Sequence, residues 1–123
     1  MNQRIHKYKG WDGKKMLPAV DLSQSGKHWG WLGKVDAVLL QYTEIDDMDG
    51  VELFDGDVFD YDYLRGGLRH IFRCEIFYSS RKASWYFECP DNQDTGLLSY
   101  LPRDSIKFLG SSLELYGKKY EKR

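Results

Sequence analysis

Two adjacent glycines, Gly66 and Gly67, separate two segments in which apolar and polar residues alternate. The segment VFDYDYL precedes the glycines, and the segment HIFRCEIFY follows them at residues 70–78. A period of two is typical of a strand with one buried face, and two glycines supply the positive φ angles of a two-residue hairpin loop. The sequence therefore predicts a β-hairpin, and this hairpin constrains the fold more than any other feature.

The two segments also predict the register of that hairpin. A two-residue loop puts Tyr63 opposite His70, Tyr61 opposite Phe72 and Phe59 opposite Cys74, and all three partners lie on the apolar face of HIFRCEIFY. The same register puts Asp60 opposite Arg73 on the other side, which is a favourable pair. Because both segments agree on one register, we expect Phe59, Tyr61 and Tyr63 to face the core.

Further short strands follow in the sequence. The segment ASWYFECP, residues 83–90, alternates in the same way and ends at a proline, so it extends the hairpin to a three-stranded meander. Residues 106–109 read as a short closing strand after a turn at Pro102. With nineteen aromatic residues (nine Tyr, six Phe, four Trp) available for a core, these strands predict a mainly β protein whose sheet curls into a small antiparallel barrel.

The N-terminal third is less regular. Asp12-Gly13 is a hairpin signal, and the segment SGKHWGWLGK is either a loop or a strand. Thr43 and Asp46 resemble a helix capping box that Gly50 would end, but Asp49-Gly50 equally fits a hairpin turn. Both alternatives for residues 43–50 stay open. We expect one domain over residues 1–123, with an irregular region at 1–40, the barrel at 41–115 and a basic tail at 116–123.

Composition bears on the compartment. The chain has no apolar run near the roughly 20 residues of a membrane span and no apolar segment of a secretory signal at its start, which favours a cytoplasmic protein without membrane contact. The two cysteines, Cys74 and Cys89, are too few for a disulfide framework. The allowed loop lengths place Cys89 opposite either Cys74 or Phe72, so we expect two reduced thiols that lie close together.

Charge is strongly segregated along the chain. Between Val35 and Leu64 there are ten acidic residues and no basic one. We expect Asp57, at a strand start after Gly56, to accept local backbone N–H groups in a structural role. Eight others are predicted to form one negative face that meets a basic surface of a partner protein, and we call them the acidic set: Glu44, Asp46, Asp47, Asp49, Glu52, Asp55, Asp60 and Asp62.

Aromatic residues offer a second kind of contact. The strand aromatics could stack on single-stranded nucleic acid, but the acids between them would repel phosphates, so direct nucleic-acid binding is disfavoured. Trp29 and Trp31 are the better candidates for an exposed partner anchor, with packing against the barrel as the alternative.

Established chemistries find little support in the sequence. An EF-hand aligned on Gly50 would need acids where Ile45 and Gly56 stand. Asp60 and Asp62 share one strand face beside Arg73, as exposed sheet residues commonly do, and the predicted core position of the two cysteines and His70 argues against nucleophilic catalysis. No glycine spacing matches a phosphate loop. We therefore expect no catalytic residues, no metal site and no cofactor, although an irregular carboxylate site at Asp47, Asp49 and Asp55 stays open.

A family resemblance emerges from the segment QYTEIDDMDGVELFDGD, residues 41–57. It resembles the signature of the YopX family of phage and prophage proteins, which reads Gln-Tyr-Thr-Gly-Leu-x-Asp-x-Asn-Gly-x-x-Ile-Tyr-Glu-Gly-Asp. The identical positions are Gln41, Tyr42, Thr43, Asp47, Gly50, Gly56 and Asp57. Trp11, Asp12 and Met16 near the start and Gly110 and Glu114 near the end are similar to the flanks of that family.

The chain departs from the family pattern at Glu44, where glycine is usual, at Asp46, where lysine is frequent, and after Glu114, where an Asn-Pro-Glu segment is missing. The resemblance implies an SH3-like barrel behind a mixed α+β N-terminal region and an origin in a mobile element. It implies no activity. The sequence thus predicts a non-enzymatic phage or prophage accessory protein of the host-cell cytoplasm that acts through protein contacts. The alternatives are an acidic decoy of a nucleic-acid-binding protein and a metal-dependent enzyme, and a homo-oligomer stays open.

Overall fold

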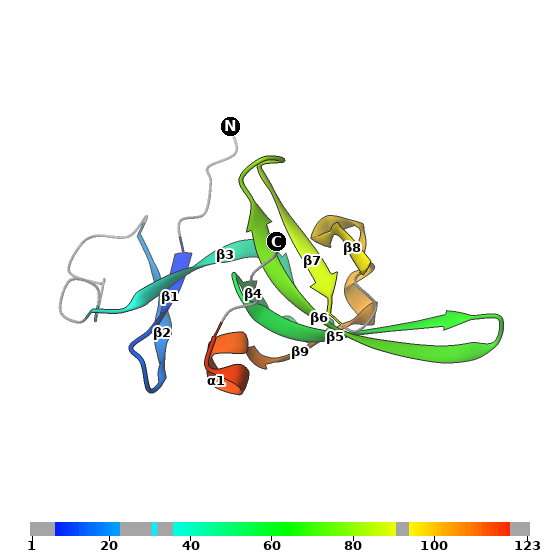
Figure 1. The fold of residues 1–123 in the computed structure, drawn as a ribbon, viewed down its shortest axis with the longest axis horizontal. Coiled ribbons are helices and arrows are strands. Elements are labelled where there is room, and N and C mark those ends of the chain that lie inside the picture. The colour runs from blue at the N-terminus through cyan, green and yellow to red at the C-terminus, as the bar shows by residue number, and fades with distance from the viewer. Residues whose placement is uncertain (1–6, 23–30, 32–35, 91–93, 119–123) are drawn as a thin grey trace.

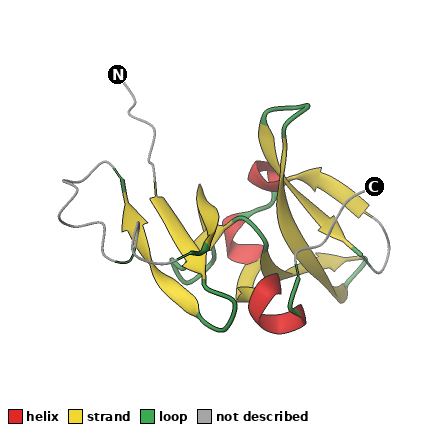
Figure 2. Cartoon of the chain, turned by 60° about the vertical axis from the view of Figure 1, so that its left-hand side comes forward, coloured by secondary structure: helices red, strands yellow, loops and turns green. Residues whose placement is uncertain are grey.

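A computed structural model describes residues 7–22, 31, 36–90 and 94–118. In this part the protein is mainly β and has two antiparallel sheets, with strand orders β2-β1-β3-β4 and β8-β7-β6-β5-β9. Figures 1 and 2 show the two sheets side by side, with the N-terminal strands in one and the β5–β6 hairpin in the other. No helix among the described residues is long and apolar enough to cross a membrane.

The first sheet holds the N-terminal third. Its strands are β1 (Lys7–Trp11), β2 (Met16–Asp21), β3 (Val38–Asp46) and β4 (Glu52–Phe54). The predicted Asp12-Gly13 turn joins β1 to β2, and the Asp12 carboxylate accepts the N–H groups of Lys14 and Lys15, both at 2.8 Å. The described parts of residues 1–40 are therefore mostly strands, where an irregular, mixed α+β region was expected.

Residues 47–51 form the turn of a hairpin between β3 and β4, which decides between the two alternatives for residues 43–50. Asp46 pairs with Glu52 across β3 and β4, and Gly50 takes a φ of 81° in the turn between them. Thr43 caps no helix, because its hydroxyl donates to the Leu53 carbonyl at 2.8 Å. A capping box does occur in the chain, but at Ser111 and Glu114.

The second sheet contains β5 (Asp57–Arg65), β6 (Leu68–Ser79), β7 (Ser84–Cys89), β8 (Asp94–Leu97) and β9 (Ile106–Ser111). Short helices in the described part of the chain accompany it: the 3-10 turns η2 (Leu98–Tyr100) and η3 (Arg103–Ser105), and α1 (Ser112–Tyr116). The hairpin register predicted from the sequence is confirmed, since Tyr63 pairs with His70 and Asp60 with Arg73. Gly66 and Gly67 have φ angles of 61° and 79°, as a two-residue type I′ loop requires.

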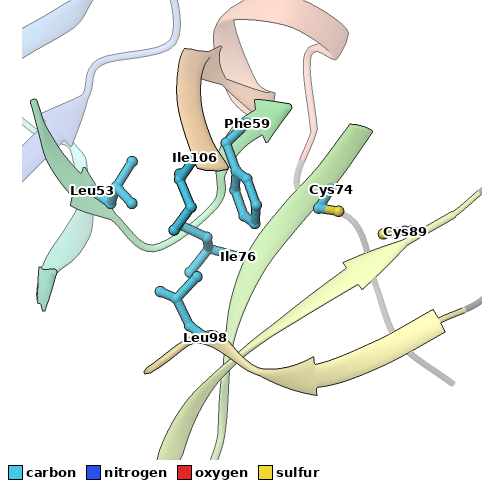
Figure 3. Packing of buried hydrophobic residues seen from close by; sticks show 7 residues of the cluster. All are labelled: Leu53, Phe59, Cys74, Ile76, Cys89, Leu98 and Ile106. Atoms are coloured by element: carbon cyan, nitrogen blue, oxygen red, sulfur yellow. The ribbon is translucent and has the colours of Figure 1, made fainter. Parts of the chain in front are cut away.

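The main core lies against the second sheet. Leu53, Phe59, Ile76, Leu98 and Ile106 converge in it (Figure 3), and each side chain is buried. A smaller buried cluster lies on the first sheet and consists of Leu40, Tyr42 and Phe54. The described strands form two sheets and no closed barrel, so the closure expected from the sequence is not seen.

The two cysteines lie on adjacent strands. Glu75 pairs with Glu88, and this register brings Cys74 of β6 beside Cys89 of β7. Both are free thiols, exposed by 0% and 3%. Burial, together with the contact to Cys89, raises the pKa of the Cys74 thiol well above its ordinary value.

We expect these thiols to be reduced and unreactive in the native protein. A thiol reagent should count two groups per chain after denaturation without reductant, and should react with the native protein far more slowly, because a buried neutral thiol is a poor nucleophile. A count near zero in the denatured protein would mean that the two cysteines form a disulfide.

Candidate functional site

The acidic set does not form a face of unpaired carboxylates. Basic residues from outside residues 35–64 reach four of its members. These ion pairs are Glu52 with Lys7, Asp49 with Lys107, Asp60 with Arg73, and Asp62 with Arg69. Asp46 accepts the Tyr42 hydroxyl, and Glu44 and Asp55 also make interactions within the chain. The fold therefore mixes charges that the sequence keeps apart.

Asp47 belongs to the structure of a loop and not to an exposed surface. Its side chain is fully buried, its Oδ1 accepts the N–H groups of Asp49 and Val51 at 2.8 and 2.9 Å, and its Oδ2 accepts that of Phe108 at 3.0 Å. Burial alone would raise its pKa, but these backbone donors outweigh burial and lower it. The inclusion of Asp47 in a partner-binding face was wrong, because the β3–β4 turn wraps around its carboxylate.

Asp57 has the structural role predicted for it. Its Oδ2 accepts the Phe54 N–H at 2.7 Å, and its Oδ1 accepts the Lys9 ammonium at 2.6 Å. Asp57 is fully buried and Lys9 is 8% exposed, with the Lys9 ammonium also lying over the rings of Phe54 and Phe108. This pair joins β1 of the first sheet to β5 of the second. Lys9 had not been singled out from the sequence, where it resembles the other lysines of the N-terminal segment.

The outer half of the β5–β6 hairpin extends beyond the strands that flank its inner half. We call residues 62–73 the hairpin arm. β9 pairs with β5 only as far as Tyr61, and β7 pairs with β6 only from Glu75 onward, so among the described strands each strand of the arm pairs only with the other. Figure 1 shows the arm projecting away from the rest of the molecule.

The two faces of the arm differ. On one face Tyr63 stacks on His70 and Phe72, with ring centroids 5.2 and 5.6 Å apart, and Tyr61 extends the stack toward the core. On the other face the Arg69 Nε donates to both oxygens of Asp62 at 2.9 and 3.0 Å. Large aliphatic side chains are exposed on both faces: Leu64 (76%) and Ile71 (54%) beside the Asp62–Arg69 pair, and Leu68 (67%) on the face of the aromatic stack.

The aromatic side chains of β5, which were predicted to face the core, become less buried toward the arm. Phe59 is fully buried and Tyr61 packs against the core, but Tyr63 lies on the arm and is only half-buried. His70 stacks on Tyr63 and neighbours Phe72 on the arm, away from Cys74 and Cys89 in the core. Among the described residues, no imidazole lies beside either thiol.

Trp31 packs against the first sheet. Its indole N–H donates to the Pro18 carbonyl at 2.8 Å, and its ring lies so close over Gly10 that a Cβ there would come within 2.5 Å of it. Trp31 thus takes the packing alternative and is not an exposed anchor. Trp29 lies outside the described residues.

The carboxylates of Glu75 and Glu88 are buried, which the sequence does not predict. Glu75 and Glu88 are directly opposite each other on β6 and β7, and each is 5% exposed. Both make interactions within the chain. In the sequence both alternate with core residues, which by itself is typical of exposed positions on a half-buried strand. Within the described part of the chain, no group of three His, Cys, Asp or Glu side chains is arranged to hold a metal ion.

In comparisons with protein-family models, curated proteins and solved structures, nothing matches this chain. The hairpin arm is the place where exposed apolar side chains, exposed guanidinium groups and strand edges without a neighbouring strand come together.

Replacing Asp57 with alanine should destabilise the protein by about 3 kcal/mol, because the Lys9 ammonium and the Phe54 N–H would both lose a buried acceptor. Adding Lys9→Met should recover part of that loss, since it removes the buried charge. Urea unfolding at pH 7 of the single and double variants measures both effects. A double variant less stable than Asp57→Ala would contradict the coupling.

The Asp57 carboxyl should also set a pH dependence. Burial raises its pKa to about 6, against the opposing effects of Lys9 and the Phe54 N–H. The folded protein then holds a proton that the unfolded chain, with a pKa of about 3.9, has lost. The stabilisation from this group is therefore complete below about pH 4 and is lost as the pH rises through about 6. The unfolding free energy of the wild type, relative to that of Asp57→Asn, should fall across this window, and equal pH profiles would contradict the raised pKa.

Replacing Asp47 with asparagine should cost about 2 kcal/mol, because the amide puts a donor against one of three backbone N–H groups. The matched control is Asp49→Asn, two residues away and exposed, which should cost less than about 0.5 kcal/mol.

The lowered pKa of Asp47 means that its contribution to stability is present above about pH 4 and is lost as the pH falls further. Asp47→Asn should therefore lose less stability than the wild type on acidification below about pH 4. Thermal unfolding at several pH values tests both points.

Proposed function

We propose that this protein is a non-enzymatic binding protein that holds a partner protein on its hairpin arm. The observation that carries the proposal is the exposure of three aliphatic side chains at the projecting end of β5 and β6, each more than half exposed: Leu64 and Ile71 on the face of the Asp62–Arg69 pair, and Leu68 on the face of the aromatic stack. Large apolar side chains that stay exposed together are typical of protein-binding sites. The aromatic stack and Asp62–Arg69 pair give the arm a fixed shape on which a partner can dock.

The acidic set ranks below the arm as a contact surface. Four of its carboxylates already face a lysine or an arginine, so the negative potential they present to a basic partner is reduced. Association through such a face would also weaken steeply with salt, whereas contacts of Leu64, Leu68 and Ile71 would not. These two surfaces therefore predict different salt dependences for the same partner.

Membership in the YopX-like group of phage and prophage proteins is part of the proposal. It rests on the segment QYTEIDDMDGVELFDGD. In this segment Asp47 stabilises the β3–β4 turn and Asp57 stabilises the start of β5 by accepting backbone N–H groups. In this proposal the five-stranded sheet, with Leu53 of β4 packed into its core, is the counterpart of the SH3-like barrel of that family. The protein would then work in the cytoplasm of the host cell.

Site-specific photocrosslinking tests the arm as the contact surface. A benzoylphenylalanine at position 68 should crosslink one partner from host-cell lysate, whereas the same residue at Tyr100, which is 79% exposed but lies outside the arm, should not. The variant Leu64→Ser/Leu68→Ser/Ile71→Thr should reduce capture of that partner at least about tenfold, since several apolar anchors are lost.

The control variant is Glu44→Gln/Asp46→Asn/Asp49→Asn, which changes the acidic set and leaves Asp47 and the arm intact. It should capture the partner as the wild type does, at low and high salt. Loss of capture in this variant, with retention in the arm variant, would assign the contact to the acidic set and refute the arm proposal.

A further inference from the structure

The outer half of β6 has an open backbone edge. β7 pairs with β6 from Glu75 to Ser79 and ends at Cys89, where Pro90 follows. Proline has no N–H for a strand ladder, so β7 stops there. No described strand continues the line of β7 along residues 68–73.

The loop geometry identifies which backbone groups face that edge. A two-residue type I′ loop closes on a hydrogen-bonded pair, which here is Arg65 with Leu68. Hydrogen-bonded and non-hydrogen-bonded pairs alternate in an antiparallel ladder. Arg69, Ile71 and Arg73 therefore occupy non-hydrogen-bonded positions with respect to β5, and their N–H and C=O groups point away from it.

The side chains beside that edge favour a particular neighbour. Arg69 and Arg73 lie on one face, with exposed fractions of 67% and 57% for their side chains. The aromatic stack with His70 and Phe72 lies on the other face. β5, which already pairs with β6 on its opposite edge, alternates acids with aromatic residues and makes both kinds of contact: Asp62 binds Arg69, and Tyr63 stacks on His70.

We propose that the open edge of β6 takes an extended segment of a partner protein as an added antiparallel strand. The segment would alternate acidic residues, which bind the Arg69 and Arg73 guanidinium groups, with apolar or aromatic residues, which cover Leu68 and Phe72. Main-chain hydrogen bonds to Arg69, Ile71 and Arg73 hold the strand, and the alternating side chains select it. This inference rests on the proposed function of the arm and names its mode of binding.

Synthetic peptides test the proposal directly. The fluorescent peptide VFDYDYL, which copies residues 58–64, has the required alternation, and VFKYKYL reverses its charge. Fluorescence anisotropy with the full-length protein should show binding of the first peptide and at least about tenfold weaker binding of the second, since like charges would then face Arg69 and Arg73. Equal binding of the two peptides would refute the charge selection.

N-methylated peptides test the added strand without changing the protein. Methylation of both aspartate N–H groups and methylation of both tyrosine N–H groups block opposite edges of the peptide, so only one of the two should lose binding. Equal loss in both, or loss in neither, would refute strand addition. On the protein, Ile71→Pro removes an outward N–H and should abolish binding, whereas Ile71→Thr keeps the N–H and should retain most of it.

The remaining outcomes separate the two proposals. If no peptide binds but the arm variant still loses its photocrosslinked partner, the function of the arm stands and strand addition is refuted. Sedimentation of the protein without peptide shows whether a second copy occupies the edge. Self-association that Ile71→Pro abolishes would replace the partner segment with another copy of the chain, and a monomer that binds VFDYDYL supports the proposal.

Discussion

The fold depends on the corner made by Gly56 and Asp57, where the chain passes from the first sheet to the second. The Gly56 N–H donates to the Ile76 carbonyl at 3.0 Å, and its own carbonyl accepts the Ser112 N–H at 2.8 Å, so one residue joins β6 to the start of α1. Its φ of 78° is readily adopted only by glycine. The next residue, Asp57, binds Lys9 of the first sheet. Because β5 begins at this point, the corner also fixes the direction in which the hairpin arm leaves the body.

The charge distribution shows how a fold can reverse the impression given by a sequence. The segment from Val35 to Leu64 has no base of its own, yet Lys7, Arg69, Arg73 and Lys107 come from strands on either side to meet its acids. Each exposed pair contributes little to stability. Their combined effect is on the electrostatic surface, where acids and bases interleave. Asp47 and Asp57 are different, because they are buried and accept backbone N–H groups that would otherwise have no acceptor in the protein.

The parts of the fold that the sequence predicted are those set by local chemistry. The β5–β6 register followed from two glycines and two matching alternations, and the role of Asp57 followed from its place after Gly56. Burial depends on the rest of the chain, and this is where sequence reasoning failed. The alternation places Phe59 and Tyr63 on one face of the strand, but it does not indicate that β9 and β7 end before they reach the level of Tyr63. It likewise cannot tell that Glu75 and Glu88 are covered, or that Lys9 reaches across to the second sheet.

The arm itself follows from where its neighbours end. Pro90 ends β7, and Pro102 precedes the 3-10 turn that delays β9 until Ile106, so β5 and β6 run on alone. A two-stranded ribbon is marginally stable without help, and here the stack of Tyr63, His70 and Phe72 supplies that help on one face. Natural proteins commonly protect an open edge with charge, and Arg69 and Arg73 lie along this one. Such residues oppose pairing with basic strands and favour an acidic one, so the same two side chains would protect the edge and select its partner.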